Sequence, residues 1–315
     1  MRAPETLRAP RRRGRADALR TGVIATLLYY DIWRYPLTAS ELRAFHPRPA
    51  PPLPAFARSL EDMVRDGALR SEHGFYWLSG RGGLAGERLR RQRHARRMWA
   101  AAHVAARIIK AFPFVRAVFV SGDLSKNATG RGSDVDFFIL TEPGRLWITR
   151  TLLVLFKKTV LMNSRKFFCV NSFAATDAMV VAGRNIYQAT EIAQLKPLYN
   201  TGLFRAYLDA NGWIRRFFPN FDTGPLRLPR ATERRSLLQR LAELPFRFLP
   251  ADRIDAALMR AMKREWARRH PELDERMRDE IFLCARGESR AYAGNFQGKI
   301  LRAYEARLRT HGVAS

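Results

Sequence analysis

The segment from residue 115 to residue 140 constrains the fold of this chain more than any other. Val115–Val120 is a short run of β-branched and apolar residues and Asp134–Leu140 is a second, so both are predicted strands. Ser121 and Gly122 follow the first strand directly and indicate a turn. Because helical patterns lie on both sides of these strands, the sequence predicts an α+β fold with a sheet flanked by helices.

Two acidic residues stand at the beginning of the second predicted strand. Asp134 and Asp136 are two positions apart. Side chains of a strand alternate between its faces, so both carboxylates point to the same side, about 7 Å apart. Carboxylates this close repel each other, and a divalent cation that prefers oxygen ligands, Mg²⁺ or Mn²⁺, offsets the repulsion. We therefore expect Asp134 and Asp136 to bind the metal and to be the catalytic residues, since such ions assist phosphoryl transfer.

The turn between the two strands carries residue types that bind phosphate. Gly122 lets the backbone approach a phosphate group closely and directs N–H groups toward it. Hydroxyl and ammonium donors to a triphosphate are supplied nearby by Ser121, Ser125, Lys126 and Ser133. We expect these five residues to hold the phosphates of a nucleotide substrate.

A Ser-Gly turn followed by Asp-x-Asp on the next strand resembles the DNA polymerase β-like nucleotidyltransferase superfamily. The likeness covers residues 112–174. It implies a mixed sheet, two acids that bind Mg²⁺, and a turn that holds the β- and γ-phosphates of an NTP. Over residues 20–220 the chain also looks like bacterial uncharacterised nucleotidyltransferase-domain proteins. The further segments that carry this wider likeness are Tyr35–Thr38, Arg184–Tyr187 and Pro197–Asn200.

Two positions depart from the pattern of that superfamily. Asp123 stands where the family has serine, and an acid there repels a phosphate unless its side chain turns away. The family also has a third carboxylate on the third strand, predicted here over residues 166–174. Asn171 occupies the facing position, and an amide cannot act as a base. Asp177, just beyond that strand, and Glu191, on the next predicted helix, are the alternative candidates.

Residues 20–80 have the element order of a winged helix-turn-helix. Three helical patterns are followed by a hairpin around Glu72–Gly74. Thr38 and Glu41 predict a capping box at the start of the second helix. The third helix carries as many acidic as basic residues, so a DNA contact and a protein contact are equally compatible with this module. Residues 1–19 are rich in Arg and Pro and are expected to be a disordered basic arm.

The remaining chain divides into two predicted parts. Residues 81–222 form the nucleotidyltransferase core, which includes a long helix over 84–110 and helical segments after the third strand. Residues 223–315 form a helical C-terminal region. The Gly- and Pro-containing stretch 222–230 is the predicted linker between the two parts.

The charge and the cysteine content of the chain limit which partners and which cellular location are expected. Lys and Arg number 56 against 29 Asp and Glu, a net charge of +27 that favours a polyanionic partner, either an NTP or nucleic acid. Only 8 of the basic residues are lysines, so part of this charge reflects an Arg-rich composition. Two cysteines exclude a disulfide scaffold. No apolar run reaches the ~18 residues of a spanning helix, and no secretory signal is present, so a cytoplasmic protein without a transmembrane segment is expected.

A cluster of basic residues follows the acidic strand. Its members are candidate contacts to triphosphate or nucleic acid: Arg145, Arg150, Lys157, Lys158, Arg165 and Lys166.

Two functions are compatible with these patterns. The first is a metal-dependent nucleotidyltransferase that moves a nucleoside monophosphate from an NTP to an acceptor hydroxyl on a protein, a nucleic acid or a small molecule, and releases pyrophosphate. The alternative is a catalytically degenerate protein of the same fold that acts as a nucleic-acid-binding or regulatory module. Asp123 and the missing third acid favour the alternative, and the acid pair with its turn favours the enzyme.

Overall fold

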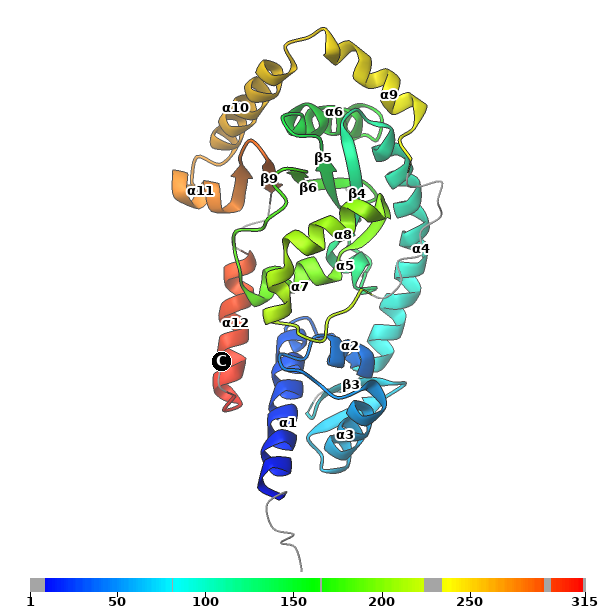
Figure 1. Cartoon of the computed structure of the whole chain (residues 1–315), viewed down its shortest axis with the longest axis vertical. Helices are drawn as coiled ribbons and strands as arrows, with labels where there is room; N and C mark the ends of the chain where they lie inside the picture. The colour runs from blue at the N-terminus through cyan, green and yellow to red at the C-terminus, as the bar shows by residue number, and fades with distance from the viewer. Residues whose placement is uncertain (1–8, 81, 165, 224–233, 292–295, 314–315) are drawn as a thin grey trace, which may run out of the picture.

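The protein is mixed α+β and elongated (Figure 1), with an N-terminal module at one end, a six-stranded sheet in the middle and part of the C-terminal region over the other end. The computed structural model describes residues 9–80, 82–164, 166–223, 234–291 and 296–313. The predicted linker 222–230 lies almost entirely outside these residues.

The N-terminal module consists of three helices and a small antiparallel sheet. Its elements are α1 (Ala9–Asp31), β1 (Leu37–Thr38), α2 (Ala39–Ala44), α3 (Leu53–Arg65), β2 (Leu69–Glu72) and β3 (Phe75–Leu78). The strand order is β1-β3-β2. The expectation of a disordered arm is wrong for residues 9–19, which belong to α1; their Ala and Arg content favours a helix. Residues 1–8 lie outside the described part of the chain.

Local signals in this module are confirmed. His73 and Gly74 have φ values of 52° and 77°, as a two-residue hairpin turn between right-twisted strands requires. Thr38 caps α2: its hydroxyl accepts from the N–H of Glu41, and the Glu41 carboxylate accepts from the N–H of Thr38.

The central sheet has the order β7-β4-β5-β6-β9-β8. Its strands are β4 (Val115–Ser121), β5 (Asp136–Thr141), β6 (Cys169–Ala175), β7 (Lys196–Tyr199), β8 (Phe282–Cys284) and β9 (Glu288–Ala291). Within the described part of the chain, β5 and β6 are the one parallel pair of this sheet, and α6 (Leu146–Thr159) connects them; the other pairs are antiparallel.

Alternate residues of the central strands fill two cores. Val118 and Phe137 face α6, the C-terminal half of α4 (Leu84–Ala111) and Trp266 of α10 (Ala251–Arg269). Phe119 and Phe138 face the opposite side, where α8 (Thr201–Ala210) packs on them. Helix α7 (Ile186–Gln194) covers the same side (Figure 1). The acid-bearing end of β5 therefore opens toward α7.

Helix α4 joins the two parts of the molecule. Its first residues pack against the hairpin of the N-terminal module, while its last turns pack on β4 and β7 (Figure 1). Its observed length agrees with the predicted helix over 84–110.

The C-terminal region is not wholly helical and not a separate unit, contrary to the prediction. Strands β8 and β9 extend the central sheet beyond β6, and α12 (Phe296–Thr310) packs against α1 and α7. The other helices there are α9 (Leu237–Glu243) and α11 (Glu275–Ile281). Among the helices that the structure describes, none combines the length and apolar character needed to cross a membrane.

Candidate functional site

A tight turn connects β4 to the acidic strand. The single helical turn α5 (Gly122–Ser125) starts directly at the end of β4. Gly122 has a left-handed φ of +63°, and a Cβ added to it would lie 2.5 Å from Oδ2 of Asp136. Ser121 and Asp136 are direct partners in the antiparallel register of β4 and β5. Strand pairing thus places the predicted phosphate-binding turn against the second acid of the pair.

The two acids flank a buried residue. Strand β5 begins at Asp136, so the prediction that the strand includes Asp134 is wrong by two residues. Val135 between them is fully buried, and its N–H and C=O bond to Lys166 and Cys169 at 2.9 and 3.1 Å. This bonding keeps the backbone next to β6. Asp134 and Asp136 are both half-buried on either side of that residue.

Burial and like charge act on Asp136. Removal from water raises the pKa of Asp136 to about 6; a hydrogen bond from Cys169 lowers it, and the negative charges of Asp134, Asp123 and Glu191 raise it further. Burial also raises the pKa of the Cys169 thiol to about 12, so this group keeps its proton and donates. A positive charge near the carboxylate of Asp136 would therefore stabilise its ionised form.

Of the two carboxylates that are candidates for the third acid, the structure brings one to the site. The amide of Asn171 lies 2.8 Å from the Cys169 sulfur and is not a carboxylate in any case. Asp177 follows the far end of β6, whereas Asp136 pairs with the first residue of that strand. Glu191 of α7 is close enough to act on Asp136, and its Oε1 accepts from Nζ of Lys126 at 2.6 Å.

The carboxylates of the site fit a metal ion that is bound partly by protein side chains and partly by a substrate. Within the residues that the structure describes, no three His, Cys, Asp or Glu side chains come together as a metal-binding group. Asp136 is nevertheless partly removed from water and lies within range of the negative charge of Asp134. Mg²⁺ is commonly bound through one or two carboxylates together with substrate phosphates. The pair suits this arrangement and does not form a complete protein cage.

The residues predicted to bind phosphate differ in their availability. Ser125 is 4% exposed and its hydroxyl donates to the carbonyl of Gly122 at 2.9 Å, so it stabilises the turn and does not face a ligand, contrary to the expectation. Ser121 is half-buried, with its hydroxyl 3.5 Å from the carbonyl of Asp136. Ser133 and Lys126 line a cavity beside the turn.

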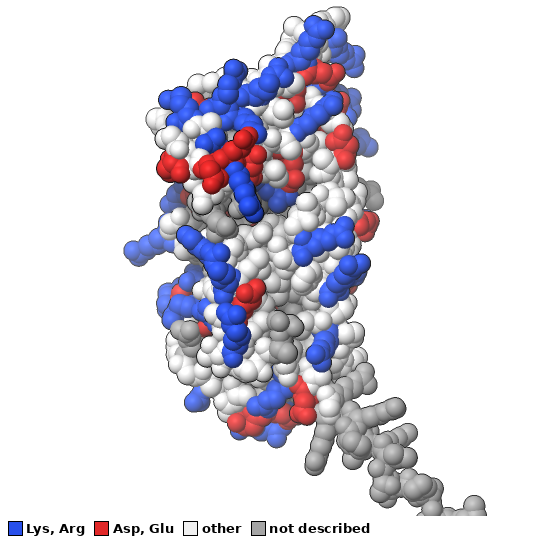
Figure 2. Space-filling view, turned by 90° about the vertical axis from the view of Figure 1, so that its left-hand side faces the viewer, with Lys and Arg blue, Asp and Glu red and all other residues white. Residues whose placement is uncertain are grey.

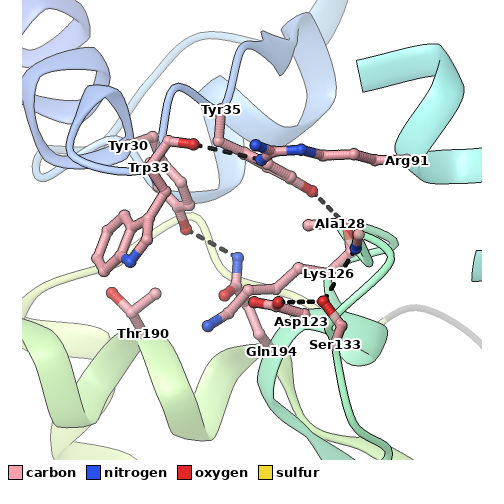
Figure 3. A pocket seen from close by; sticks show the side chains of 11 residues that line it. Tyr30, Trp33, Tyr35, Arg91, Asp123, Lys126, Ala128, Ser133, Thr190 and Gln194 are labelled. Carbon is pink, nitrogen blue, oxygen red and sulfur yellow. Dashed lines mark hydrogen bonds between the residues drawn. The ribbon is translucent and has the colours of Figure 1, made fainter. Parts of the chain in front are cut away.

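The side chain of Asp123 forms a hydrogen bond with another residue of the protein, Ser133. Its carboxylate accepts from the Ser133 hydroxyl at 2.7 Å, and the Ser133 oxygen accepts from the N–H of Gly130 at 2.9 Å. Figure 3 shows this pair at one side of the cavity. The acid that departs from the family pattern is thus held by the loop that leads into β5.

A cavity of about 280 Å³ lies between the N-terminal module and the core. One wall is aromatic and comes from the module, a contribution that the sequence patterns did not reveal. The opposite wall comes from the α5 turn and α7 (Figure 3). The side chains drawn there are Tyr30, Trp33, Tyr35, Arg91, Asp123, Lys126, Ala128, Ser133, Thr190 and Gln194.

Hydrogen bonds across the cavity fix the module to the core. Nε2 of Gln194 donates to the hydroxyl of Tyr30 at 2.9 Å, and the hydroxyl of Tyr35 donates to the carbonyl of Lys126. The aromatic residues near the end of α1 are therefore positioned by α7 and by the turn.

The predicted basic cluster is divided by the structure. Arg145 pairs with Asp252 of α10. Arg150 is buried, with its guanidinium 5.2 Å from the ring centre of Trp266. Lys157 and Lys158 border a separate cavity of about 610 Å³ between α6 and α10, and Arg165 lies outside the described residues. Basic side chains are spread along the whole face shown in Figure 2 without forming one patch.

Comparison of the chain with protein-family models, with curated protein sequences and with solved structures gave no match. Function is therefore inferred from the turn, the acids and the cavity, which adjoin one another.

Proposed function

We propose that this chain is a metal-dependent nucleotidyltransferase, which transfers a nucleoside monophosphate from an NTP to an acceptor hydroxyl and releases pyrophosphate. The observation that carries the proposal is the contact between Gly122 and Asp136. A glycine in the left-handed region leaves the carboxylate directly against the backbone of the turn. A phosphate group approached by that backbone lies beside the acid that holds the metal.

Each group of the site has a role in this reaction. Asp134 and Asp136 hold Mg²⁺ together with the phosphates, and their ionised form is the ligand. When bound, the ion stabilises the charge that develops on the attacking and leaving oxygens. Lys126, positioned by Glu191, places a positive charge beside the turn. Because Glu191 is paired with that lysine, two acids and the substrate complete the metal's coordination in this proposal.

The N-terminal module, in this proposal, is a winged-helix-like unit that serves the core and does not read DNA. The order of its helices and its three-stranded sheet support this part of the proposal. Acids neutralise basic side chains near the end of α3, where Arg65 pairs with Asp62 and Arg20 with Asp66. The module instead contributes Tyr30 and Trp33 to the cavity.

Pyrophosphate release measured with each of the four NTPs, with and without Mg²⁺, tests the proposal. The double variant Asp134→Asn, Asp136→Asn is expected to lose Mg²⁺-dependent release and to keep its circular dichroism spectrum. Asp177→Asn, at the other end of β6, is the matched control and is expected to retain turnover. Unchanged turnover in the double variant would end the proposal.

Binding measurements separate the enzyme from the non-enzymatic alternative. A nucleic-acid-binding module loses affinity steeply as salt rises, at any Mg²⁺ concentration. The enzyme is expected to show thermal stabilisation by an NTP that requires Mg²⁺. Stabilisation by nucleic acid alone, independent of Mg²⁺, would favour the alternative.

A further inference from the structure

One wall of the cavity carries a buried acceptor that lacks a partner. Gln194 is 7% exposed, and its Nε2 donates to Tyr30. Its Oε1 is buried and has no hydrogen-bond partner among the residues that the structure describes. An unsatisfied buried acceptor is uncommon in native proteins and destabilises the folded state. A ligand with a hydrogen-bond donor at this position would satisfy it.

The size and lining of the cavity restrict what enters it. Its volume of about 280 Å³ lies at the lower end of the range for small-molecule sites, about 300–1,000 Å³, so it suits a small ligand and not a polymer strand. Trp33, which is half-buried, provides a flat apolar surface, and Lys126 provides a cationic group. A nucleoside joined to phosphates fits these features, because its base is flat and forms hydrogen bonds, and its phosphates are anions that the neighbouring turn can bind.

The cavity lies beside the turn that is proposed to bind phosphate. Asp123 lines it and is the neighbour of Gly122, and Ser133 lines it and is the neighbour of Asp134. A ligand in the cavity therefore has residues adjoining the turn and the first acid along one of its walls.

We propose that the cavity holds the base and sugar of the nucleotide, and that Oε1 of Gln194 accepts a hydrogen bond from an exocyclic amino group of the base. This inference rests on the proposed function and names its substrate class: nucleotides whose base has an amino group where the related base has a carbonyl. Adenine compared with hypoxanthine, and cytosine compared with uracil, differ in this way.

The chemistry gives the direction and size of the preference. An amino group donates to Oε1, whereas a carbonyl in its place sets two acceptors against each other. Leaving a buried acceptor unsatisfied corresponds to a loss of about tenfold in affinity.

Calorimetric titration of the full chain with ATP against ITP, and with CTP against UTP, in the presence of Mg²⁺, tests this inference. The pair that fits the cavity is expected to show about tenfold tighter binding of its amino-bearing member. Equal affinities within both pairs would overturn the inference. A preference for ITP or UTP would overturn it too, because the amide would then present Nε2 to the ligand.

Two variants on α7 assign the preference to one side chain. Gln194→Leu removes the acceptor and is expected to make the two members of the pair bind equally, whereas Gln194→Glu retains acceptor oxygens and is expected to retain the preference. Gln188→Leu is the matched control, since Gln188 is equally buried on α7 and pairs with Gln297 away from the cavity. A preference that survives in Gln194→Leu contradicts the role of this residue. The measurements on the native chain still decide the question if the leucine variant does not fold.

The outcomes distinguish this inference from the function on which it rests. If no nucleotide binds, the proposed function fails and the inference fails with it. If nucleotides bind with Mg²⁺ but without regard to the amino group, only the inference fails.

Discussion

The carboxylate of Asp136 lies against the α-carbon of Gly122, so that a Cβ at that glycine would be 2.5 Å from Oδ2 of the acid. Two requirements therefore meet at one position. The backbone needs a left-handed φ, and the acid needs the space that a side chain would fill. Glycine meets both requirements, because it adopts a left-handed φ without strain and has no side chain to displace the carboxylate.

The substitution Gly122→Ala is expected to affect both stability and turnover. The left-handed backbone alone destabilises an alanine by about 1–2 kcal/mol. Displacement of the Asp136 carboxylate is expected to lower turnover about a hundredfold, since a shift of about 1 Å in a catalytic group has effects of this size. Thermal unfolding and pyrophosphate release measure the two effects.

Gly67→Ala is the control for this experiment. Gly67 has a φ of +80° and nothing within 4 Å of an added Cβ. It is expected to show the backbone effect on stability without a loss of turnover. Equal turnover in Gly122→Ala and Gly67→Ala would show that the contact with Asp136 has no role in the reaction.

The raised pKa of Asp136, about 6 against an ordinary value of 3.8, predicts a pH-dependent stability. Between these two values the folded protein binds more protons than the unfolded chain, so the free energy of unfolding falls as pH rises from about 4 to about 6. Asp136→Asn removes this dependence. In EDTA the variant is expected to be more stable than the native protein by about 2–3 kcal/mol above pH 6, and equally stable below pH 4. Urea unfolding across this range measures the difference, and parallel curves for the two proteins would contradict it.

The ion pair between Lys126 and Glu191 predicts different effects for its two members. Lys126→Met removes the positive charge beside the turn and is expected to weaken NTP binding about tenfold. Glu191→Gln keeps an oxygen that accepts from Lys126, so its effect on turnover is expected to stay within about fivefold. Steady-state kinetics separates KM from kcat for both variants. A hundredfold loss of kcat in Glu191→Gln would instead identify Glu191 as the third metal ligand.

An ion pair between a buried arginine and a half-buried glutamate holds α4 to the N-terminal module. Arg88 is 2% exposed, lies 2.8 Å from Oε1 of Glu41 and stacks 3.5 Å above the ring centre of Tyr35. Burial lowers the pKa of Arg88 to about 9 and raises the pKa of Glu41, so either charge alone is unfavourable.

Arg88→Met is accordingly expected to lower the free energy of unfolding by about 3–5 kcal/mol. Arg88→Met combined with Glu41→Gln is expected to be less destabilised, because no charge is left uncompensated. Arg268→Met, in an exposed pair with Glu265, is the control and is expected to lose less than about 1 kcal/mol. Chemical denaturation of these variants and of Glu41→Gln alone measures the coupling, and additive effects of the two single changes in the double variant would contradict it.

Features that depend on neighbouring residues could be predicted from the sequence. The turn at His73 and Gly74 and the capping box at Thr38 are set by residues a few positions apart. The strand, turn and strand around Gly122 were predicted for the same reason, with an error at the start of β5.

Features that depend on distant pairing were missed. Strand β7 contains Pro197, which argues against a strand in a sequence but is tolerated here at the edge of the sheet. Strand β9 has the polar sequence Glu288–Ala291 and pairs with β6, from which it is far removed along the chain. The aromatic wall of the cavity was missed for the same reason: periodicity places Tyr30 on a helix but does not show that Gln194 faces it.

The pairing of β9 with β6 has a consequence for synthesis of the protein. While a growing chain has not yet released residues 282–291, one edge of β6 has unpaired peptide groups, and such edges attract other chains. Helix α1 likewise lacks its packing partner until α12 is synthesised. In the folded protein the ring centres of Tyr29 in α1 and Tyr304 in α12 are 5.2 Å apart. Assembly of the sheet is therefore a late event in translation, and ribosomes that stall before this point are expected to yield aggregation-prone fragments.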